Sequence, residues 1–145
     1  MFISTKIRYN STIKEGFELK YVMTENGFET TLEFGTLTIS GDETKGFRPY
    51  QLLVSSLVGC SGGVLRKVCE KMRMPIEEME INVLEVLRNP EEASKLEKVH
   101  LHFILKGTNL DAAKMERAMI VTMKNCSMVR SVDQSMEVIE TFELV

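Results

Sequence analysis

The chain has 145 residues, of which 43% are hydrophobic and 27% are charged, and its formal net charge is -3 at pH 7. These values are typical of one soluble globular domain, 1–145, and exclude a largely disordered chain. The weak negative charge gives no electrostatic basis for binding nucleic acid or an acidic membrane surface, so we expect neither partner.

The sequence favours a cytoplasmic protein. Its first residues lack the continuous apolar core and the cleavage site of a signal peptide. The most apolar run, Leu52–Leu65, is shorter than the roughly 20 residues that a membrane span needs. Three cysteines in a reducing compartment also disfavour a permanent structural disulfide.

The N-terminal part predicts strands. Residues 3–9 alternate in part, and residues 17–23 read as a second strand. Glu25-Asn26-Gly27 is a good hairpin turn before a strand expected over 28–37. Residues 41–49, rich in glycine and proline, predict a loop.

A long helix is predicted over residues 50–73. Pro49 stands at a favoured first position, and Pro75 bounds the far end. The first half of this segment is apolar on nearly every side, and the second half is amphipathic. A helix that is apolar all round needs more cover than one sheet and one helix provide, so we expect an intimate homodimer.

The C-terminal half predicts two strands, a helix, a short helical turn and a last strand. Residues 97–106 alternate between apolar and polar side chains, which is typical of a half-buried strand. The expected elements are 79–87, 97–106, a helix capped at Thr108-Asn109 and running to Lys124, 127–133 and 137–145. This order predicts an α+β fold with antiparallel sheets packed against a long buried central helix.

Cys60 is the first candidate for chemistry. It lies in the predicted central helix among Gly59, Gly62 and Gly63. Each glycine inside a helix costs about 1 kcal/mol relative to alanine, and such local violations often mark a site or a close backbone approach. The alternative is that Cys60 is a small buried packing residue.

The other two cysteines leave the pairing open. Cys69 follows Cys60 by nine positions, which places it half a turn out of phase on the same helix and predicts a structural role. Cys126 follows the second helix, in a loop that could swing to a helix-borne partner. Spacing alone allows three possible cysteine pairs.

No metal or cofactor is expected. His100 and His102 share the polar face of one predicted strand, and spacing indicates no third ligand. The sequence contains no phosphate-binding loop, dinucleotide fingerprint, nucleophile elbow or paired-cysteine zinc motif.

Two motifs together resemble the OsmC/Ohr family. Residues 49–60, PYQLLVSSLVGC, resemble the family segment in which a proline precedes a cysteine by eleven positions. Residues 125–129, NCSMV, resemble its second motif, in which a loop cysteine precedes a short helix. The strand 99–107 is also similar, and the Cys-Ser pair at 126 and 127 most resembles the YhfA-like branch.

The resemblance implies an intertwined α+β homodimer that reduces organic hydroperoxides. By position, Cys60 would be the attacking thiolate and Cys126 the resolving thiol, with a dithiol reductant regenerating the pair. Condensation of a sulfenic acid with a nearby thiol protects it from irreversible oxidation. An apolar pocket would favour organic peroxides over hydrogen peroxide.

One position departs from the family pattern. Peroxidase members carry a glutamate directly after the proline, paired with an arginine that holds the thiolate, whereas this chain has Tyr50 followed by Gln51. Arg8, Lys14 and Arg48 are candidate cations by neighbourhood only. A cysteine in mid-helix gains little from its own helix N-terminus, so we expect an adjacent cation to lower its pKa.

Three functional hypotheses therefore stay open. The first is a thiol-dependent peroxidase using Cys60 and Cys126. The second is a dimeric sensing or binding protein with a small hydrophobic ligand, motivated by Tyr50. The third is a stable dimer whose cysteines are only packing residues.

Overall fold

The computed structural model describes residues 19–145. The chain divides into two compact units, Met1–Arg48 and Pro49–Val145. The strand expected over 3–9 and the candidate cations Arg8 and Lys14 lie outside the described residues. The single domain expected over 1–145 stays a prediction.

The first unit contains a three-stranded antiparallel sheet. Its strands are β1 (Val22–Met23), β2 (Gly27–Thr31) and β3 (Thr36–Ser40), in the order β1-β2-β3. The expected turn before β2 is present, since the N–H of Thr24 donates to the carbonyl of Gly27 at 2.8 Å. A Cβ at Gly27 would lie 2.0 Å from the carbonyl oxygen of Ile39, so the close approach of β3 requires glycine there.

The single strand expected over 28–37 is wrong. A turn interrupts it, in which the N–H of Leu32 donates to the carbonyl of Gly35 at 2.9 Å. Phe34 is fully exposed at the tip of this turn. An apolar residue in the turn hid it, because hairpin turns are recognised by their polar and glycine residues.

The second unit begins with the long helix α1 (Pro49–Lys71), which confirms the helix expected over 50–73 apart from small shifts at its ends. One stripe of the helix is fully or almost fully buried: Val54, Leu57, Ser61, Leu65 and Cys69. The other apolar positions of its first half are only partly buried within the chain. By length and composition alone α1 could cross a membrane, but its buried stripe makes it a core helix of this unit.

The remaining elements follow the expected order. They are β4 (Glu78–Asn89), the short 3-10 helix η1 (Pro90–Glu92), β5 (Lys95–Lys106), α2 (Ala112–Asn125), α3 (Ser127–Val132) and β6 (Glu137–Leu144). The α2 cap is Asp111, whose side chain accepts from the N–H of Lys114, and not the expected Thr108-Asn109. Thr108 is engaged elsewhere, because its hydroxyl donates to Glu77 at 2.7 Å.

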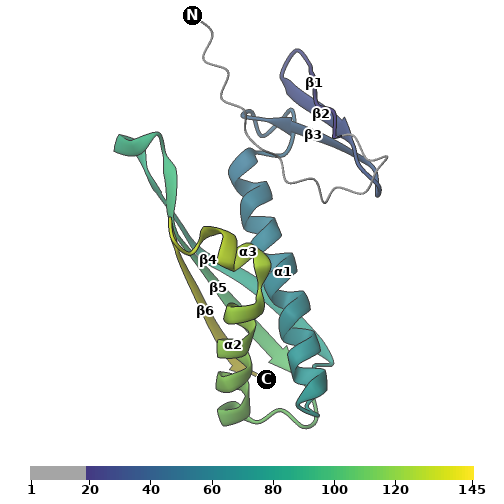
Figure 1. Cartoon of the computed structure of the whole chain (residues 1–145), viewed down its shortest axis with the longest axis vertical. Coiled ribbons are helices and arrows are strands. Elements are labelled where there is room, and N and C mark those ends of the chain that lie inside the picture. Colours follow the sequence, from purple (N-terminus) through teal and green to yellow (C-terminus); the bar gives the residue numbers. More distant parts are fainter. Residues whose placement is uncertain (1–18) are drawn as a thin grey trace, which may run out of the picture. The chain divides into compact units, whose positions relative to one another are not determined.

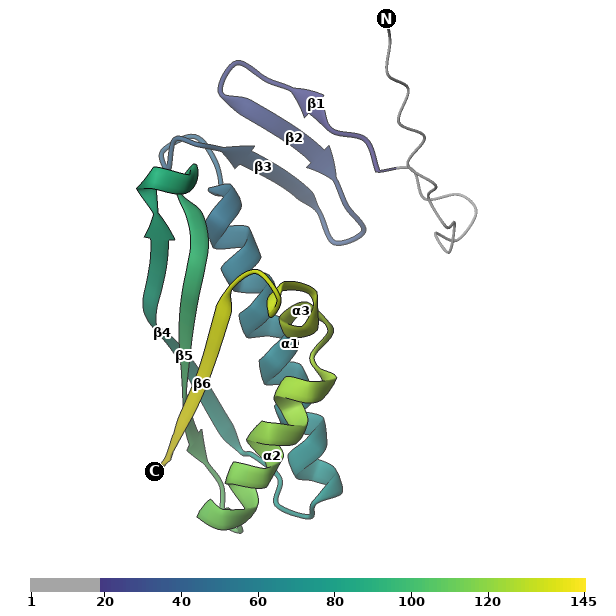
Figure 2. The same cartoon turned by 60° about the vertical axis from the view of Figure 1, so that its left-hand side comes forward.

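The second sheet has the order β4-β5-β6 and is mixed. β4 pairs with β5 antiparallel, as expected, but β6 pairs with β5 in parallel. The parallel pair arises because α2 and α3 carry the chain back along the sheet, which is the crossover that parallel strands require. Figures 1 and 2 show α1 and α2 side by side in this unit.

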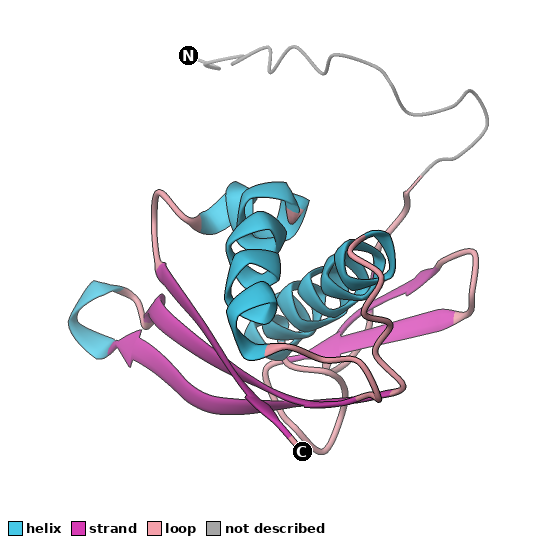
Figure 3. Cartoon of the chain, turned by 90° about the horizontal axis from the view of Figure 1, so that it is seen from below, coloured by secondary structure: helices cyan, strands magenta, loops and turns pink. Residues whose placement is uncertain are grey.

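The alternation predicted for β5 is confirmed. Val99, Leu101, Phe103 and Leu105 are all fully buried. Both long helices lie on one face of the β4-β5-β6 sheet (Figure 3). The core of this unit therefore lies between the sheet and the buried stripe of α1. Cys126 belongs to this core, and Cys60 packs against it.

Candidate functional site

The fold brings Cys60 and Cys126 together. Cys60 is half-buried in the middle of α1, and Cys126 is fully buried between α2 and α3. Cys126 is the only residue between these helices: its N–H donates to Thr122 at 2.8 Å, and its carbonyl accepts from Arg130 at 3.0 Å. Cys126 is therefore a junction residue between two helices and does not belong to the loop expected there, and its movement toward a partner stays a prediction.

Hydrogen bonds lower the pKa of the Cys60 thiol below its usual range. The largest contribution comes from the Cys126 side chain, and the next from the backbone N–H of Met128. Ser127 adds its hydroxyl, 3.6 Å from the Cys60 sulfur, and its own N–H. These groups stabilise a thiolate because they donate to a developing negative charge.

Among the described residues, backbone and side-chain donors lower the Cys60 pKa, and the expectation of an adjacent cation stays a prediction because Arg8 and Lys14 lie outside them. The free N–H groups at the start of α3 point to the sulfur, although Cys60 itself lies far from the start of α1. The helix that carries Cys60 contributes none of these N–H groups. A second helix, distant in sequence, supplies the donors instead.

The pKa of the Cys126 thiol is shifted in the opposite direction, above its usual range. Burial raises the pKa of the Cys126 thiol, and its hydrogen bond to Cys60 raises this pKa further, whereas its contacts with the Ser61 side chain and with the backbone of Val129 oppose the rise. The two thiols are free in this structure. Their environments therefore favour an ionised Cys60 beside a protonated Cys126.

Glu140, a residue not predicted from the sequence, is linked to this pair through Ser61. Ser61, fully buried on α1, donates its hydroxyl to Glu140 Oε1 at 2.5 Å. Burial raises the pKa of Glu140, and the bond from Ser61 opposes this rise. The sequence contains a sign of this carboxyl. Val138, Glu140 and Phe142 alternate on β6, so Glu140 lies on the strand face whose other side chains, Val138 and Phe142, belong to the core.

Cys69 stands apart from the thiol pair, as its helical phase predicted. It is fully buried, and its thiol lies 3.8 Å from the sulfur of Met115 on α2. Burial raises the pKa of Cys69 to about 11. This thiol is protonated at neutral pH and has the surroundings of a packing residue.

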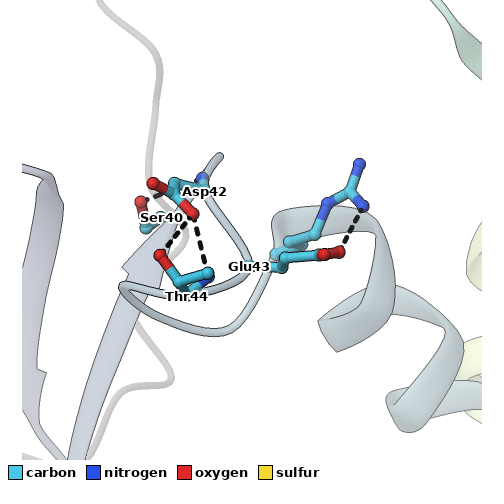
Figure 4. Close-up of polar contacts among 5 residues, drawn as sticks. Ser40, Asp42, Glu43 and Thr44 are labelled. Atoms are coloured by element: carbon cyan, nitrogen blue, oxygen red, sulfur yellow. Dashed lines mark hydrogen bonds and ion pairs between the residues drawn. The ribbon is translucent and has the colours of Figure 1, made fainter.

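Three residues were candidates for supporting Cys60 or its substrate pocket, namely Arg48, Tyr50 and Gln51. They lie at the start of α1 and just before it. Arg48 pairs with Glu43 at 3.5 Å within the first unit, next to a turn in which Asp42 accepts from Thr44 (Figure 4). Tyr50 lies under the guanidinium of Arg88, 4.9 Å from the ring centroid. Gln51 is exposed on the first turn of α1. None of these side chains is among the groups that shift the pKa of Cys60.

The two histidines form a different cluster, on the other face of β5. His100 Nε2 and His102 Nδ1 each lie 2.8 Å from the hydroxyl of Thr141. Within residues 19–145, no group of three or more histidine, cysteine, aspartate or glutamate side chains could hold a metal ion.

One protein-family model matches most of the chain. The family model described as "OsmC-like protein" matches residues 41–141, which include both cysteine motifs. The chain belongs to the OsmC-like family. No curated protein matches it in sequence.

Solved structures share the OsmC-like fold at low sequence identity. A hypothetical protein from Aquifex aeolicus has a TM-score of 0.77 and 20% identity, over 88% of this chain and 95% of that one. An OsmC-like protein from Mycoplasma pneumoniae has a TM-score of 0.76 and 17% identity, over 92% and 99%. The organic hydroperoxide resistance protein OhrB of Bacillus subtilis has a TM-score of 0.60 and 17% identity, over 88% and 98%.

Family membership confirms the resemblance drawn from the two cysteine motifs. The closer likeness to the YhfA-like branch stays a prediction. In this OsmC-like protein, hydrogen-bond donors at the start of α3 lie beside the Cys60 sulfur, and Tyr50 follows Pro49, the first residue of α1.

Proposed function

We propose that this OsmC-like protein reduces organic hydroperoxides in the cytoplasm through a dithiol–disulfide cycle of Cys60 and Cys126, as a defence against oxidative stress. One observation carries the proposal: a half-buried thiol with a lowered pKa adjoins a buried thiol with a raised pKa. The fold shared with OhrB, which is named for organic hydroperoxide resistance, agrees with it.

The cycle needs no bound metal or cofactor. The Cys60 thiolate attacks the terminal oxygen of the hydroperoxide, the O–O bond breaks, and Cys60 becomes a sulfenic acid. The leaving alkoxide takes a proton from solvent and departs as an alcohol. Cys126 then attacks the sulfenic sulfur, which forms the disulfide and releases water. A dithiol reductant exchanges with this disulfide and restores both thiols.

The surroundings of Cys60 agree with this division of roles. The attacking sulfur must be ionised and reachable, and Cys60 has the lowered pKa and the greater exposure. The resolving sulfur must stay close and protonated until it is needed, and Cys126 is held between two helices. Donors from α3 would perform the task that an arginine performs in the family pattern.

We also propose that two copies of the chain associate. A Cβ added at Gly59 or Gly63 would meet no atom within 4 Å in the chain, so this side of α1 is open. Ile120 and Val121 on α2 are exposed as well, with exposures of 56% and 41%. A second copy covering these positions would complete the burial of α1 that its apolar first half predicts.

Peroxide consumption tests the proposed activity. The wild type should consume cumene hydroperoxide in the presence of dithiothreitol, and Cys60→Ser should fall to the background rate. Cys126→Ser should lose multiple turnovers while forming a sulfenic acid at Cys60. Cys69→Ser is the matched control, since it removes another thiol of α1 and should keep turnover. Equal rates in the wild type and Cys60→Ser would end the proposal.

A second candidate function follows from Tyr50. Its ring lies under Arg88, so this position carries an aromatic ring where the peroxidase pattern has a carboxylate. The protein would then be a redox sensor or a carrier of a small hydrophobic ligand. Native mass spectrometry would favour this function if purified protein retained a ligand and turned over no peroxide.

The third hypothesis, that the cysteines only pack, predicts a different result. Neither Cys60 nor Cys126 would then react with thiol reagents before the protein unfolds. The partial exposure of Cys60 argues against this hypothesis.

A further inference from the structure

A buried chain of polar groups leads away from the two thiols into the core. Ser61 follows Cys60 on α1, and its hydroxyl oxygen is within hydrogen-bonding reach of the Cys126 thiol. The same hydroxyl donates to Glu140 Oε1 on β6 at 2.5 Å. The order is therefore Cys60, Cys126, Ser61 and Glu140, all within the second unit.

We propose that Glu140 is a positioning residue that accepts the proton of Cys126 through the Ser61 hydroxyl when the disulfide forms, and returns it when the disulfide is reduced. This inference rests on the proposed dithiol–disulfide cycle and deepens it. It assigns a role to Ser61 and Glu140, which take no part in the attack of Cys60 on the peroxide.

The burial of Glu140 argues against a purely structural role. Its Oε2 atom is buried and has no hydrogen-bond partner within residues 19–145. An unsatisfied buried carboxyl oxygen destabilises a fold, and an apolar side chain at this core position would avoid that penalty. The carboxyl oxygen Oε1 instead holds the hydroxyl that adjoins Cys126.

No other charged group competes for this carboxyl within the described residues. Burial and the Ser61 hydrogen bond account for its shifted pKa. On β5 its register partner is Leu101, and on β6 its neighbours in the same phase are Val138 and Phe142. The hydrogen-bonded chain through Ser61 connects it to the thiol of Cys126. His100 and His102 bond to Thr141, which points to the opposite face of β6.

The proton movements balance over the cycle. Cys126 gives its proton to Ser61 as Ser61 gives its own to Glu140, and the resulting thiolate attacks the Cys60 sulfenic sulfur. The S–S bond forms, the S–O bond breaks, and the leaving hydroxide takes a proton from solvent. During reduction, a thiolate of the dithiol attacks Cys60, Cys126 leaves as a thiolate, and Glu140 returns the proton through Ser61.

DTNB, an aromatic disulfide, can test this relay without peroxide. Cys60 attacks DTNB and releases the first coloured thiolate, and Cys126 then attacks the mixed disulfide and releases the second. Only the second phase requires Cys126 to lose its proton. Stopped-flow absorbance should follow both phases over a series of buffers from acidic to alkaline pH, because the ionisation of Glu140 and of Cys126 should both influence the second phase.

The expected effect is confined to the second phase. In the wild type its rate should rise with pH and level off once Glu140 is ionised. Glu140→Gln should slow it by about a hundredfold at neutral pH, which is the usual size of general acid–base assistance. The rate in that variant should keep rising toward the pKa of Cys126 itself. Glu140→Asp, which keeps a carboxyl, should restore part of the plateau.

Ser61→Ala provides the second test. If Ser61 and Glu140 act as one relay, Ser61→Ala should slow the second phase as much as Glu140→Gln, and the double variant should be no slower than either. Circular dichroism and an unchanged first phase show that each variant is folded. A second phase that keeps its wild-type rate and pH profile in Glu140→Gln would overturn the relay, as would equal slowing of both phases.

The two proposals can fail separately. If the wild type does not consume cumene hydroperoxide but the second DTNB phase depends on Glu140, the peroxidase proposal fails and the relay stands. If peroxide is consumed and neither variant changes the second phase, the relay fails and the peroxidase proposal stands.

Discussion

The thiol of Cys69 lies 3.8 Å from the sulfur of Met115, and both residues are fully buried between α1 and α2. Cys60, nine positions earlier on the same helix, adjoins Cys126 and the start of α3 instead. One helix therefore presents two thiols to different surroundings. Because burial raises the pKa of one thiol and hydrogen bonds lower that of the other, their reactivities should differ.

Replacing Cys69 should affect stability and spare the thiol chemistry. Cys69→Ala removes a fully buried sulfur and leaves a small cavity beside Met115. We expect a loss of about 1–2 kcal/mol in the free energy of unfolding, measured by urea denaturation. Peroxide consumption and both DTNB phases should stay at wild-type rates. A loss of turnover in the folded variant would contradict a packing role.

The same thiol should contribute to alkaline destabilisation. Its pKa rises from 9.0 to about 11 on folding, so the unfolded chain loses this proton before the folded protein does. Stability should therefore fall as pH rises from about 9 to about 11, by up to about 1.4 kcal/mol per pH unit. Denaturation curves of the wild type and Cys69→Ala should converge over this range, because the variant lacks this contribution. Parallel curves would contradict the raised pKa.

Removing Cys126 should make Cys60 less reactive. The Cys126 side chain is the largest cause of the lowered Cys60 pKa, so Cys126→Ala should raise that pKa and reduce the thiolate fraction at neutral pH. Alkylation of Cys60 by iodoacetamide, followed by peptide mass spectrometry, should slow several-fold at pH 7. Cys126→Ser is the control, because its hydroxyl can still donate and should keep part of the effect. Unchanged alkylation in Cys126→Ala would show that α3 alone stabilises the thiolate.

A bulky side chain at Gly63 should prevent association of two copies. A Cβ there meets no atom of its own chain, so Gly63→Leu should be compatible with the folded monomer. Light scattering should show a dimer for the wild type and a monomer for this variant. Glu91→Leu adds the same side chain at the exposed η1 segment and should stay dimeric. A dimeric Gly63→Leu would place the interface elsewhere.

Local patterns in the sequence predicted most elements of the fold. Pro49 and Pro75 bounded α1 because proline favours the first turn of a helix and disfavours its interior. The alternation from Val99 to Leu105 predicted β5 and its buried face, since side-chain direction in a strand depends on residue parity. The turn at 32–35 was missed because Phe34 is an apolar residue at its tip.

The candidate site could be predicted only in part. The two cysteine motifs identified Cys60 and Cys126 through a family resemblance, whereas spacing alone left three pairs open. The donors from Met128 and the Ser61–Glu140 contact were not predicted, since each joins segments that are remote along the chain.

The sequence by itself determined most of the secondary structure, the apolar faces of α1 and β5 and the identity of the two motifs, because these depend on neighbours within a few residues. Only the tertiary structure decided that β6 runs parallel to β5, that Cys126 lies against Cys60, and that Glu140 reaches Ser61. The crossover through α2 and α3 sets the direction of β6 and places the start of α3 at the Cys60 sulfur. Contacts of this kind depend on how helices and strands pack, which no local pattern encodes.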